Sequence, residues 1–263
     1  MAKLHHFSFS SLKKLRENPR EFYKGYIRWE RDPFWSDNMV VGSCVHKYIE
    51  LYNTNNITKK KSDIKDFVKN FLIDEWVNYL NKLEWEPETK FKKNKLIKQV
   101  MKAIDNFLEL DLEKPKDNEY KFLVDIEWNP IKLKGYIDAV YDDSLLDYKI
   151  VRWFSDPDSW FGWWNLKKYW YQGLYYCLSY NIAEDADINV CKFLEIKKTK
   201  PRTTDTHRLI TFEYTPEDFE KARSQFKKSC KLVEKLDEED ILENFDDTKV
   251  SGLGKVSFSN IKN

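Results

Sequence analysis

Residues 131–151 (IKLKGYIDAVYDDSLLDYKIV) constrain the fold more than any other stretch, because they predict two strands joined by a tight turn. Alternating residues rich in β-branched and aromatic side chains flank Asp142 and Asp143, a pair suited to a two-residue hairpin loop. In that register Asp138 would lie directly across from Asp147. Like charges facing each other destabilise a sheet, so this pair is expected to hold a cation.

Strand side chains alternate between two faces, so Lys149 is expected on the same face as Asp138 and Asp147, across from Tyr136. The opposite face is predicted to be buried and carries Ile137, Ala139, Leu146, Tyr148 and Ile150. Two carboxylates with a lysine beside them form a plausible site for cleaving a phosphodiester.

The acidic-x-Lys spacing alone has little value, because 34% of the residues are charged. It recurs at Asp63/Lys65, Glu88/Lys90, Glu119/Lys121, Glu195/Lys197 and Asp247/Lys249. Asp147/Lys149 differs by its strand-like setting and by its partner Asp138. The alternative interpretation is a solvated polar hairpin face with an ion pair that contributes little to stability.

Composition excludes several classes of protein. The net charge of +1 gives no global basic field, so nucleic-acid binding would need a local groove. The four cysteines are scattered without a Cys-x-x-Cys pair, which predicts reduced thiols and a cytoplasmic setting. The richness in Lys, Asn and Ile indicates an AT-rich source, so that setting is expected to be a bacterium or a phage-infected host. No apolar run reaches membrane-spanning length, and because MAKLHHFSFS lacks the apolar core of a signal peptide, none is expected. The seven glycines form no phosphate-binding loop, which argues against a nucleotide-driven motor.

The N-terminal segment predicts two short helices. Ser10 or Ser11 is expected to cap the first, with Leu12 and Leu15 facing inward, and Asn18-Pro19 to end it. The apolar stripe of the second is predicted to pack in the core and consists of Phe22, Tyr23 and Tyr26.

Residues 40–52 predict a loop that enters a helix capped by Ser43. His46 and Glu50 are four residues apart and share a face of that helix. Taken alone, such a histidine is more often structural than a metal ligand. Two longer amphipathic patterns, at 62–82 and 89–110, predict a helical insertion or lid.

Further strands are predicted at 120–128, 188–196 and 207–214. The first carries Asp125 and Glu127 on one face, where either would stand near the acidic pair or face solvent. A helix capped by Thr215 is expected to run to about residue 236.

The segment 153–180 is dense in aromatic residues, and its second half predicts a helix with Gln172 and Tyr176 on one face. Packing in the core is the favoured interpretation. The alternative is a platform on which unpaired bases stack. The residues assigned to that platform lie in the part predicted to be a loop, and are Trp160, Trp163 and Trp164, with Arg152 beside them.

Four segments in order resemble the RecB-like branch of the PD-(D/E)XK nuclease superfamily, which includes helicase-associated, CRISPR-adaptation and phage exonucleases. They are FSFSSLKKLRENPREFY, VGSCVHKYIE, GYIDAV with LLDYKIV, and YQGLYYCLSY, and they span residues 7–180. The resemblance implies an α/β (α+β) restriction-endonuclease-like fold, with a central mixed sheet flanked by helices and an N-terminal helical elaboration. One domain over 1–263 is expected, with 54–118 as the insertion or lid and 245–263 as a loosely ordered tail.

The resemblance also implies the roles of individual residues in a metal-dependent exonuclease. His46, Asp138 and Asp147, with the Tyr148 carbonyl, would bind Mg²⁺ or Mn²⁺. Lys149 would be the catalytic lysine. Two residues of the aromatic segment would support it, Gln172 by positioning the lysine or the DNA backbone and Tyr176 by supporting the helix.

The implied partners are DNA, single-stranded or with free ends, and a recombination, helicase or other DNA-processing protein, with no membrane. Many relatives hold an iron–sulfur cluster through cysteines near both termini. Here Asn18 occupies the first such position and no cysteine follows Cys230, so no cluster is expected. The alternatives are a catalytically silent DNA-binding or assembly module on the same scaffold, and an unrelated structural protein.

Overall fold

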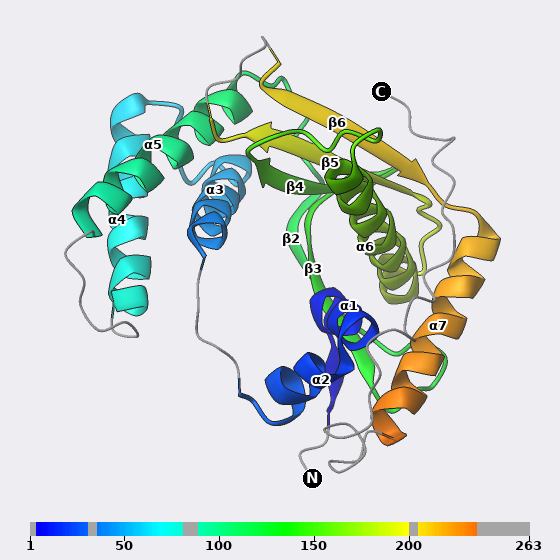
Figure 1. Cartoon of the computed structure of the whole chain (residues 1–263). Coiled ribbons are helices and arrows are strands. Elements are labelled where there is room, and N and C mark those ends of the chain that lie inside the picture. Colours follow the sequence, from blue (N-terminus) through cyan, green and yellow to red (C-terminus); the bar gives the residue numbers. More distant parts are fainter. Residues whose placement is uncertain (1–3, 31–35, 81–88, 200–204, 236–263) are drawn as a thin grey trace.

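The computed structural model describes residues 4–30, 36–80, 89–199 and 205–235 (Figure 1). The strands in this part of the chain are β1 (His6–Phe7), β2 (Asp117–Val124), β3 (Lys132–Val140), β4 (Leu145–Val151), β5 (Val190–Lys197) and β6 (His207–Glu213). The helices are α1 (Phe9–Glu17), α2 (Pro19–Phe22), the π-helical turn η1 (Tyr23–Ile27), α3 (Asp37–Asn53), α4 (Lys61–Leu80), α5 (Thr89–Leu108), α6 (Trp160–Glu184) and α7 (Pro216–Lys235).

The strands form one mixed sheet in the order β1-β3-β4-β5-β6, with β2 paired to β3 outside this path. The β1–β3 and β4–β5 pairs are parallel, and the other pairs are antiparallel. Strands β1 and β4 share one edge of β3: β1 pairs with the first residues of β3, and β4 pairs with its last residues. The predicted central mixed sheet with helices on its faces is confirmed.

The central hairpin has the predicted turn but a shorter ladder than predicted. The Tyr141 amide donates to the Ser144 carbonyl at 2.9 Å, and Ala139 pairs with Leu146 in the expected register. The pairing stops there, although all of this region is described. Asp138 and Asp147 are therefore not a paired cross-strand position, and neither are Tyr136 and Lys149. Beyond this point β4 leaves β3 and pairs along its whole length with β5 (Figure 1).

Helices cover both faces of the sheet. The first core cluster includes residues of α1, α6 and α7, and the second includes residues of α3, α4 and α5. Adjacent residues of β5 separate the two clusters, since Phe193 belongs to the first and Leu194 to the second. The predicted buried face of the hairpin follows this division except at Ile137, which belongs to the first cluster while Ala139 belongs to the second.

Two helices begin earlier than predicted. The cap of α1 is Ser8, whose Oγ accepts from the Ser11 amide at 3.1 Å while its own amide donates to Ser11 Oγ at 2.8 Å. Ser11 therefore completes a reciprocal capping box from inside the helix instead of starting it. Likewise Ser36, not Ser43, caps α3 and accepts from the Met39 amide at 3.3 Å.

The long amphipathic patterns form α4 and α5, close to the predicted ranges. These helices pack with α3 into the second cluster, and Asn106 of α5 donates to the Lys197 carbonyl at the end of β5 at 2.7 Å. Helix α7 also begins as predicted, with Thr215 Oγ1 accepting from the Asp218 amide at 3.3 Å. The predicted tail, 245–263, lies outside the described residues.

All four cysteines are buried, free thiols. Among the helices of the described ranges, none combines the length and the apolar character needed to cross a membrane.

Candidate active site

A groove of about 590 Å³ opens where β3 and β4 diverge. Helix α1, helix α3 and helix α6 contribute to its walls, and we call it the central groove. Six of the predicted site residues line it together, although they come from four elements: His46, Asp138, Asp147, Lys149, Gln172 and Tyr176. The fold thus brings to one place residues that are more than 120 positions apart in the sequence.

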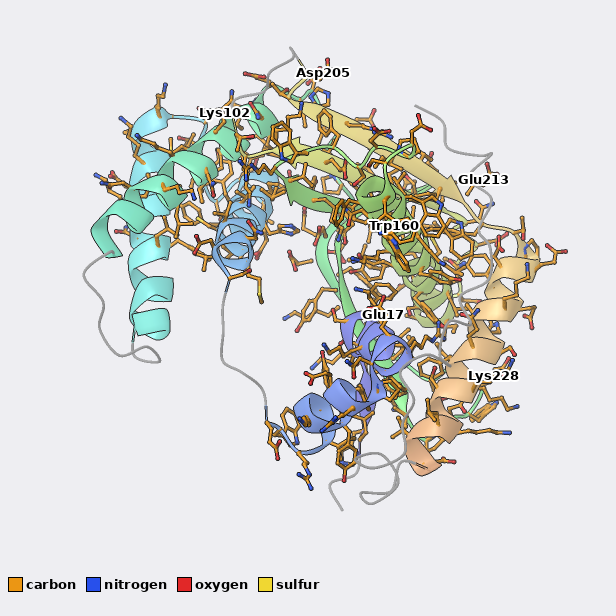
Figure 2. All side chains as sticks on the ribbon, in the orientation of Figure 1. Glu17, Lys102, Trp160, Asp205, Glu213 and Lys228 are labelled. Atoms are coloured by element: carbon orange, nitrogen blue, oxygen red, sulfur yellow. The ribbon has the colours of Figure 1, made fainter. Side chains whose placement is uncertain are left out.

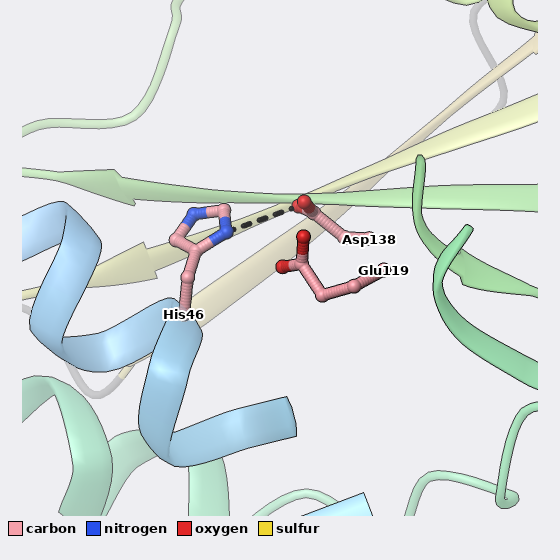
Figure 3. Close-up of side chains that lie close together, drawn as sticks. All are labelled: His46, Glu119 and Asp138. Atoms are coloured by element: carbon pink, nitrogen blue, oxygen red, sulfur yellow. Dashed lines mark ion pairs between the residues drawn. The ribbon is translucent and has the colours of Figure 1, made fainter. Parts of the chain in front are cut away.

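His46, Asp138 and Glu119 form a cluster at one side of the groove (Figure 3). Glu119 itself lines an adjoining hollow of about 520 Å³, which shares His46 with the central groove. One ligand atom from each residue lies within 4.8 Å of the others. His46 Nδ1 is 3.3 Å from Asp138 Oδ2, and that oxygen also accepts from the Tyr148 amide at 2.7 Å. In a continued ladder the Tyr148 amide would donate a hydrogen bond to the backbone of β3. Here it donates to the Asp138 side chain instead.

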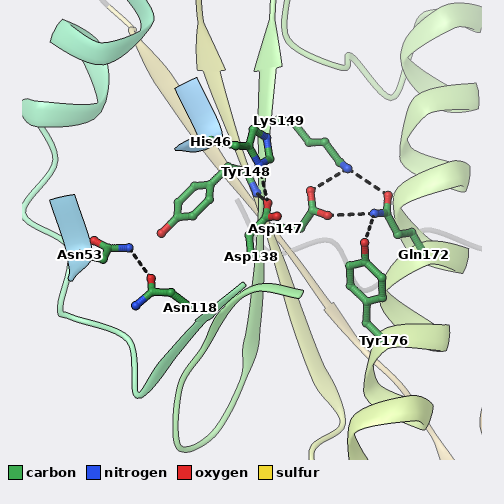
Figure 4. A network of polar contacts seen from close by, with 9 residues as sticks. All are labelled: His46, Asn53, Asn118, Asp138, Asp147, Tyr148, Lys149, Gln172 and Tyr176. Atoms are coloured by element: carbon green, nitrogen blue, oxygen red, sulfur yellow. Dashed lines mark hydrogen bonds and ion pairs between the residues drawn. The ribbon is translucent and has the colours of Figure 1, made fainter. Parts of the chain in front are cut away.

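Glu119 is the member of this cluster that the sequence prediction missed. It lies in β2 between Asn118 and Tyr120, which pair with Ala139 and Ile137, so the register sets Glu119 opposite Asp138. Its φ of 51° is unusual for a strand residue and marks a local distortion beside the site. Asn53 of α3 binds Asn118 at 2.7 Å and ties the helix that carries His46 to β2 (Figure 4).

The pKa shifts in this cluster reflect two carboxyl groups crowded around one imidazole. Burial acts to lower the pKa of His46, but the Asp138 carboxylate overrides it and raises that pKa to about 9. Burial acts to raise the pKa of Asp138, and the paired His46 keeps it below its usual value. Burial and the Asp138 charge raise the pKa of Glu119 to about 7. A bound cation would relieve this crowding.

Asp147, Lys149, Gln172 and Tyr176 form the other side of the groove (Figure 4). Lys149 Nζ lies 2.6 Å from Asp147 Oδ2 and donates to Gln172 Oε1 at 3.0 Å. The Gln172 amide nitrogen donates to Asp147 Oδ1 at 2.8 Å and to the Tyr176 hydroxyl at 2.6 Å. Helix α6 therefore fixes both the carboxylate and the lysine of β4.

Asp147 is buried, and burial raises its pKa, an effect that Lys149 only partly counters. Within the described residues, its Oδ2 accepts no hydrogen bond of good geometry despite the close lysine. An oxygen in that state is suited to a further positive partner.

The donor set fits a hard divalent cation. Carboxylate oxygens are the ligands preferred by Mg²⁺ and Mn²⁺, and an imidazole favours Mn²⁺ among them. His46, Glu119 and Asp138 meet this requirement by proximity, and Asp147 supplies a buried oxygen across the groove. Tyr148, whose carbonyl is the other predicted ligand, packs its ring in the second cluster and against His46.

Other sequence expectations for this region need correction. Strand β2 ends at Val124, and Asp125 and Glu127 are exposed beyond it rather than carried on the strand. Glu50 shares the helix face of His46 but pairs with Lys47 at 2.7 Å.

The predicted tryptophans lie at the start of α6 instead of in a loop, because Ser159 caps the helix and accepts from the Gly162 amide at 3.0 Å. Trp160 is 70% exposed and is labelled in Figure 2, while Trp163 and Trp164 are half-buried. Arg152 is exposed, with its guanidinium 5.7 Å from the ring centre of Trp153.

The comparisons with known proteins agree with this geometry. Residues 6–244 match the family model of the PD-(D/E)XK nuclease superfamily. The fold is similar to the crystal structure of a candidate exonuclease from Eubacterium rectale, with a TM-score of 0.54 and 12% identity, covering 90% of this chain and 80% of that one. No curated protein matches the chain. The chain belongs to the PD-(D/E)XK nuclease superfamily, whose members are nucleases that use divalent metal ions.

Proposed function

We propose that the protein is an exonuclease of the RecB-like branch, which hydrolyses phosphodiester bonds in DNA during recombination or repair. The observation that carries this proposal is the assembly of His46, Asp138, Asp147 and Lys149 in one groove. These residues come from segments that resemble that branch in the same order. The similar fold of a candidate exonuclease supports the same activity.

The proposed metal ligands are His46, Asp138, Asp147 and the Tyr148 carbonyl, with Glu119 added by the structure. When bound, a divalent ion would polarise the scissile phosphate and acidify the attacking water. Asp138 is suited to hold the ion because His46 and the Tyr148 amide fix its carboxylate from two directions.

Lys149 is the proposed catalytic lysine. Its ammonium group is held by Asp147 and Gln172, and it lies 5.6 Å from the ring centre of Tyr169. A cation fixed in advance can orient the attacking water or stabilise charge that develops on the phosphoryl oxygens. Gln172 sets the direction of the lysine, and the Tyr176 hydroxyl sets the direction of the Gln172 amide.

The proposal treats the chain as one nuclease domain in which residues 54–118 are a helical insertion. The packing of α4 and α5 with α3 in one cluster supports a single domain. No iron–sulfur cluster is proposed, and elemental analysis of the purified protein should find no stoichiometric iron. At the position where many relatives have a cluster cysteine, the Asn18 side chain instead caps α2 by accepting from the Glu21 amide at 2.9 Å.

The test is digestion of end-labelled linear DNA and of covalently closed circular DNA of the same sequence, with Mg²⁺ or Mn²⁺. We expect the linear form to be degraded from its ends and the circle to survive. Cleavage of the circle at the same rate would replace the exonuclease with an endonuclease. If the protein binds DNA but cleaves neither form, a catalytically silent binding module would be favoured.

A further inference from the structure

We propose that the groove takes an unpaired DNA strand, which runs along α6 from the metal site to a platform formed by Trp160, Trp163 and Trp164. This inference rests on the proposed function for the class of substrate. It adds the path of the strand and the residues that would guide it.

The spacing of α6 defines the path. Trp160, Trp164, Lys168, Gln172 and Tyr176 recur every four residues, so they form one continuous ridge that winds around the helix at about 26° to its axis. Along this ridge Lys168, Gln172 and Tyr176 line the central groove, and Trp164 lies closer to the start of the helix. At 1.5 Å per residue, Trp160 and Gln172 are about 18 Å apart along the axis. That length matches about five nucleotides at the 3.4 Å rise of a stacked strand.

The wall between the two ends of this path is continuous. A second, smaller hollow of about 30 Å³ lies between α1 and α6 and includes Trp164 in its lining. Phe9, Lys13 and Lys168 line both this hollow and the central groove. The smaller hollow is too narrow for a base, so a strand would cross it on the surface and reach the tryptophans beyond.

The charges along the path favour a polyanion. Lys13, Lys134 and Lys168 line the central groove from three different elements, in addition to the proposed catalytic Lys149. The opposing carboxylates in that groove are those of the proposed metal site, Asp138 and Asp147. Glu17 is the opposing charge at the smaller hollow, and Lys13 pairs with it at 3.3 Å. The chain as a whole has a net charge of only +1, so this local set of lysines is what would attract phosphates.

The tryptophans are arranged to stack on bases rather than to fill a core. Trp160 is mostly exposed, and Trp163 stacks on it at 6.3 Å with 26° between the ring planes. Trp164 contacts both rings edge-on at 5.8 and 5.3 Å. Lys167 Nζ lies 4.9 Å from the Trp163 ring centre, which adds positive charge at the platform. An exposed indole supported from below is a sequence-tolerant surface for unpaired bases.

The experiment measures the equilibrium affinity of the full chain, in EDTA, for a labelled single-stranded oligonucleotide and for the duplex of the same length. Binding in EDTA needs neither metal nor cleavage, so its outcome is separate from that of the digestion test. We expect Trp160→Ala to weaken single-strand binding about five- to hundredfold. Duplex binding should change much less, because it depends on phosphate contacts.

A control matches this variant. Trp128→Ala removes an equally large and more exposed indole, 96% exposed, that lines neither hollow. It should keep the wild-type preference, and both variants should keep the wild-type unfolding midpoint.

Equal weakening of single-strand and duplex binding by Trp160→Ala would overturn the inference, as would an effect no larger than that of Trp128→Ala. Loss of folding in Trp160→Ala would also overturn it, by assigning the ring to packing. If the wild-type chain binds only duplex, the proposed path is wrong even where the digestion test succeeds.

Discussion

The two sides of the central groove balance their charges differently. On one side His46, Glu119 and Asp138 bring two carboxylates against one imidazole, and the pKa of Glu119 rises to about 7. On the other side Asp147 and Lys149 neutralise each other, and Gln172 holds both. On the first side two carboxylates are crowded around one imidazole, whereas on the second the protein itself supplies a cation, and only Asp147 Oδ2 is left without a well-aligned hydrogen bond among the described residues. The first side is therefore expected to gain more from an added cation.

The largest effect is expected on the side formed by Asp147, Lys149 and Gln172, for the variant Lys149→Ala. Loss of one preorganised positive group should lower the single-turnover cleavage rate about 10²–10³-fold. DNA affinity should stay nearly unchanged, since one lysine contributes little to many phosphate contacts. Lys192→Ala is the matched control, because Lys192 binds Ser144 at the turn end of the same hairpin and lies outside the groove. Equal loss of affinity and rate would instead make Lys149 a binding residue.

If a cation binds at the first side, it should raise the melting temperature. At a concentration of Mg²⁺ or Ca²⁺ about 100 times the Kd, binding should stabilise the protein by about 2.7 kcal/mol, or roughly 5–10 °C in Tm. Asp138→Asn should remove most of this shift, whereas Asp143→Asn, in the exposed turn, should keep it. A full shift in Asp138→Asn would place the cation elsewhere.

A smaller effect is expected for Tyr176→Phe. Loss of the hydroxyl that accepts from Gln172 removes one hydrogen bond, about 0.5–1.5 kcal/mol, so the cleavage rate should fall roughly two- to tenfold. Tyr180→Phe, one helical turn further along α6, is the control and should cleave at the wild-type rate. An unchanged rate in Tyr176→Phe would show that Gln172 holds the lysine without this support.

The smallest expected effect is a change in stability that depends on whether metal is present. Without metal, Glu119→Gln should stabilise the protein by about 0.2–1 kcal/mol, because it removes a like charge opposite Asp138. With metal, the same variant should bind the ion more weakly and lose that advantage. Chemical unfolding in EDTA and in Mg²⁺ measures both. Destabilisation in EDTA would show that Glu119 is held by contacts other than this crowded pair.

Local sequence patterns were sufficient for most of the elements. Alternation located β3 and β4, and helical periodicity located α4 and α5. Side-chain capping was predicted correctly at Thr215, but the caps of α1 and α3 were placed too late. Several serines compete at those helix starts, and the choice depends on where the preceding chain enters.

The sequence by itself placed Asp138, Asp147 and Lys149 on one predicted hairpin, and Gln172 and Tyr176 on one face of one predicted helix. Only the tertiary structure decided that β4 leaves β3 before Asp138, that Glu119 joins the cluster, and that Trp160 begins a helix with its ring exposed. Local periodicity fixes the face on which a side chain lies within its own element. The divergence of two strands depends on contacts with a distant segment, here the pairing of β4 with β5, and the exposure of a ring depends on which distant segments cover it. No local pattern contains either.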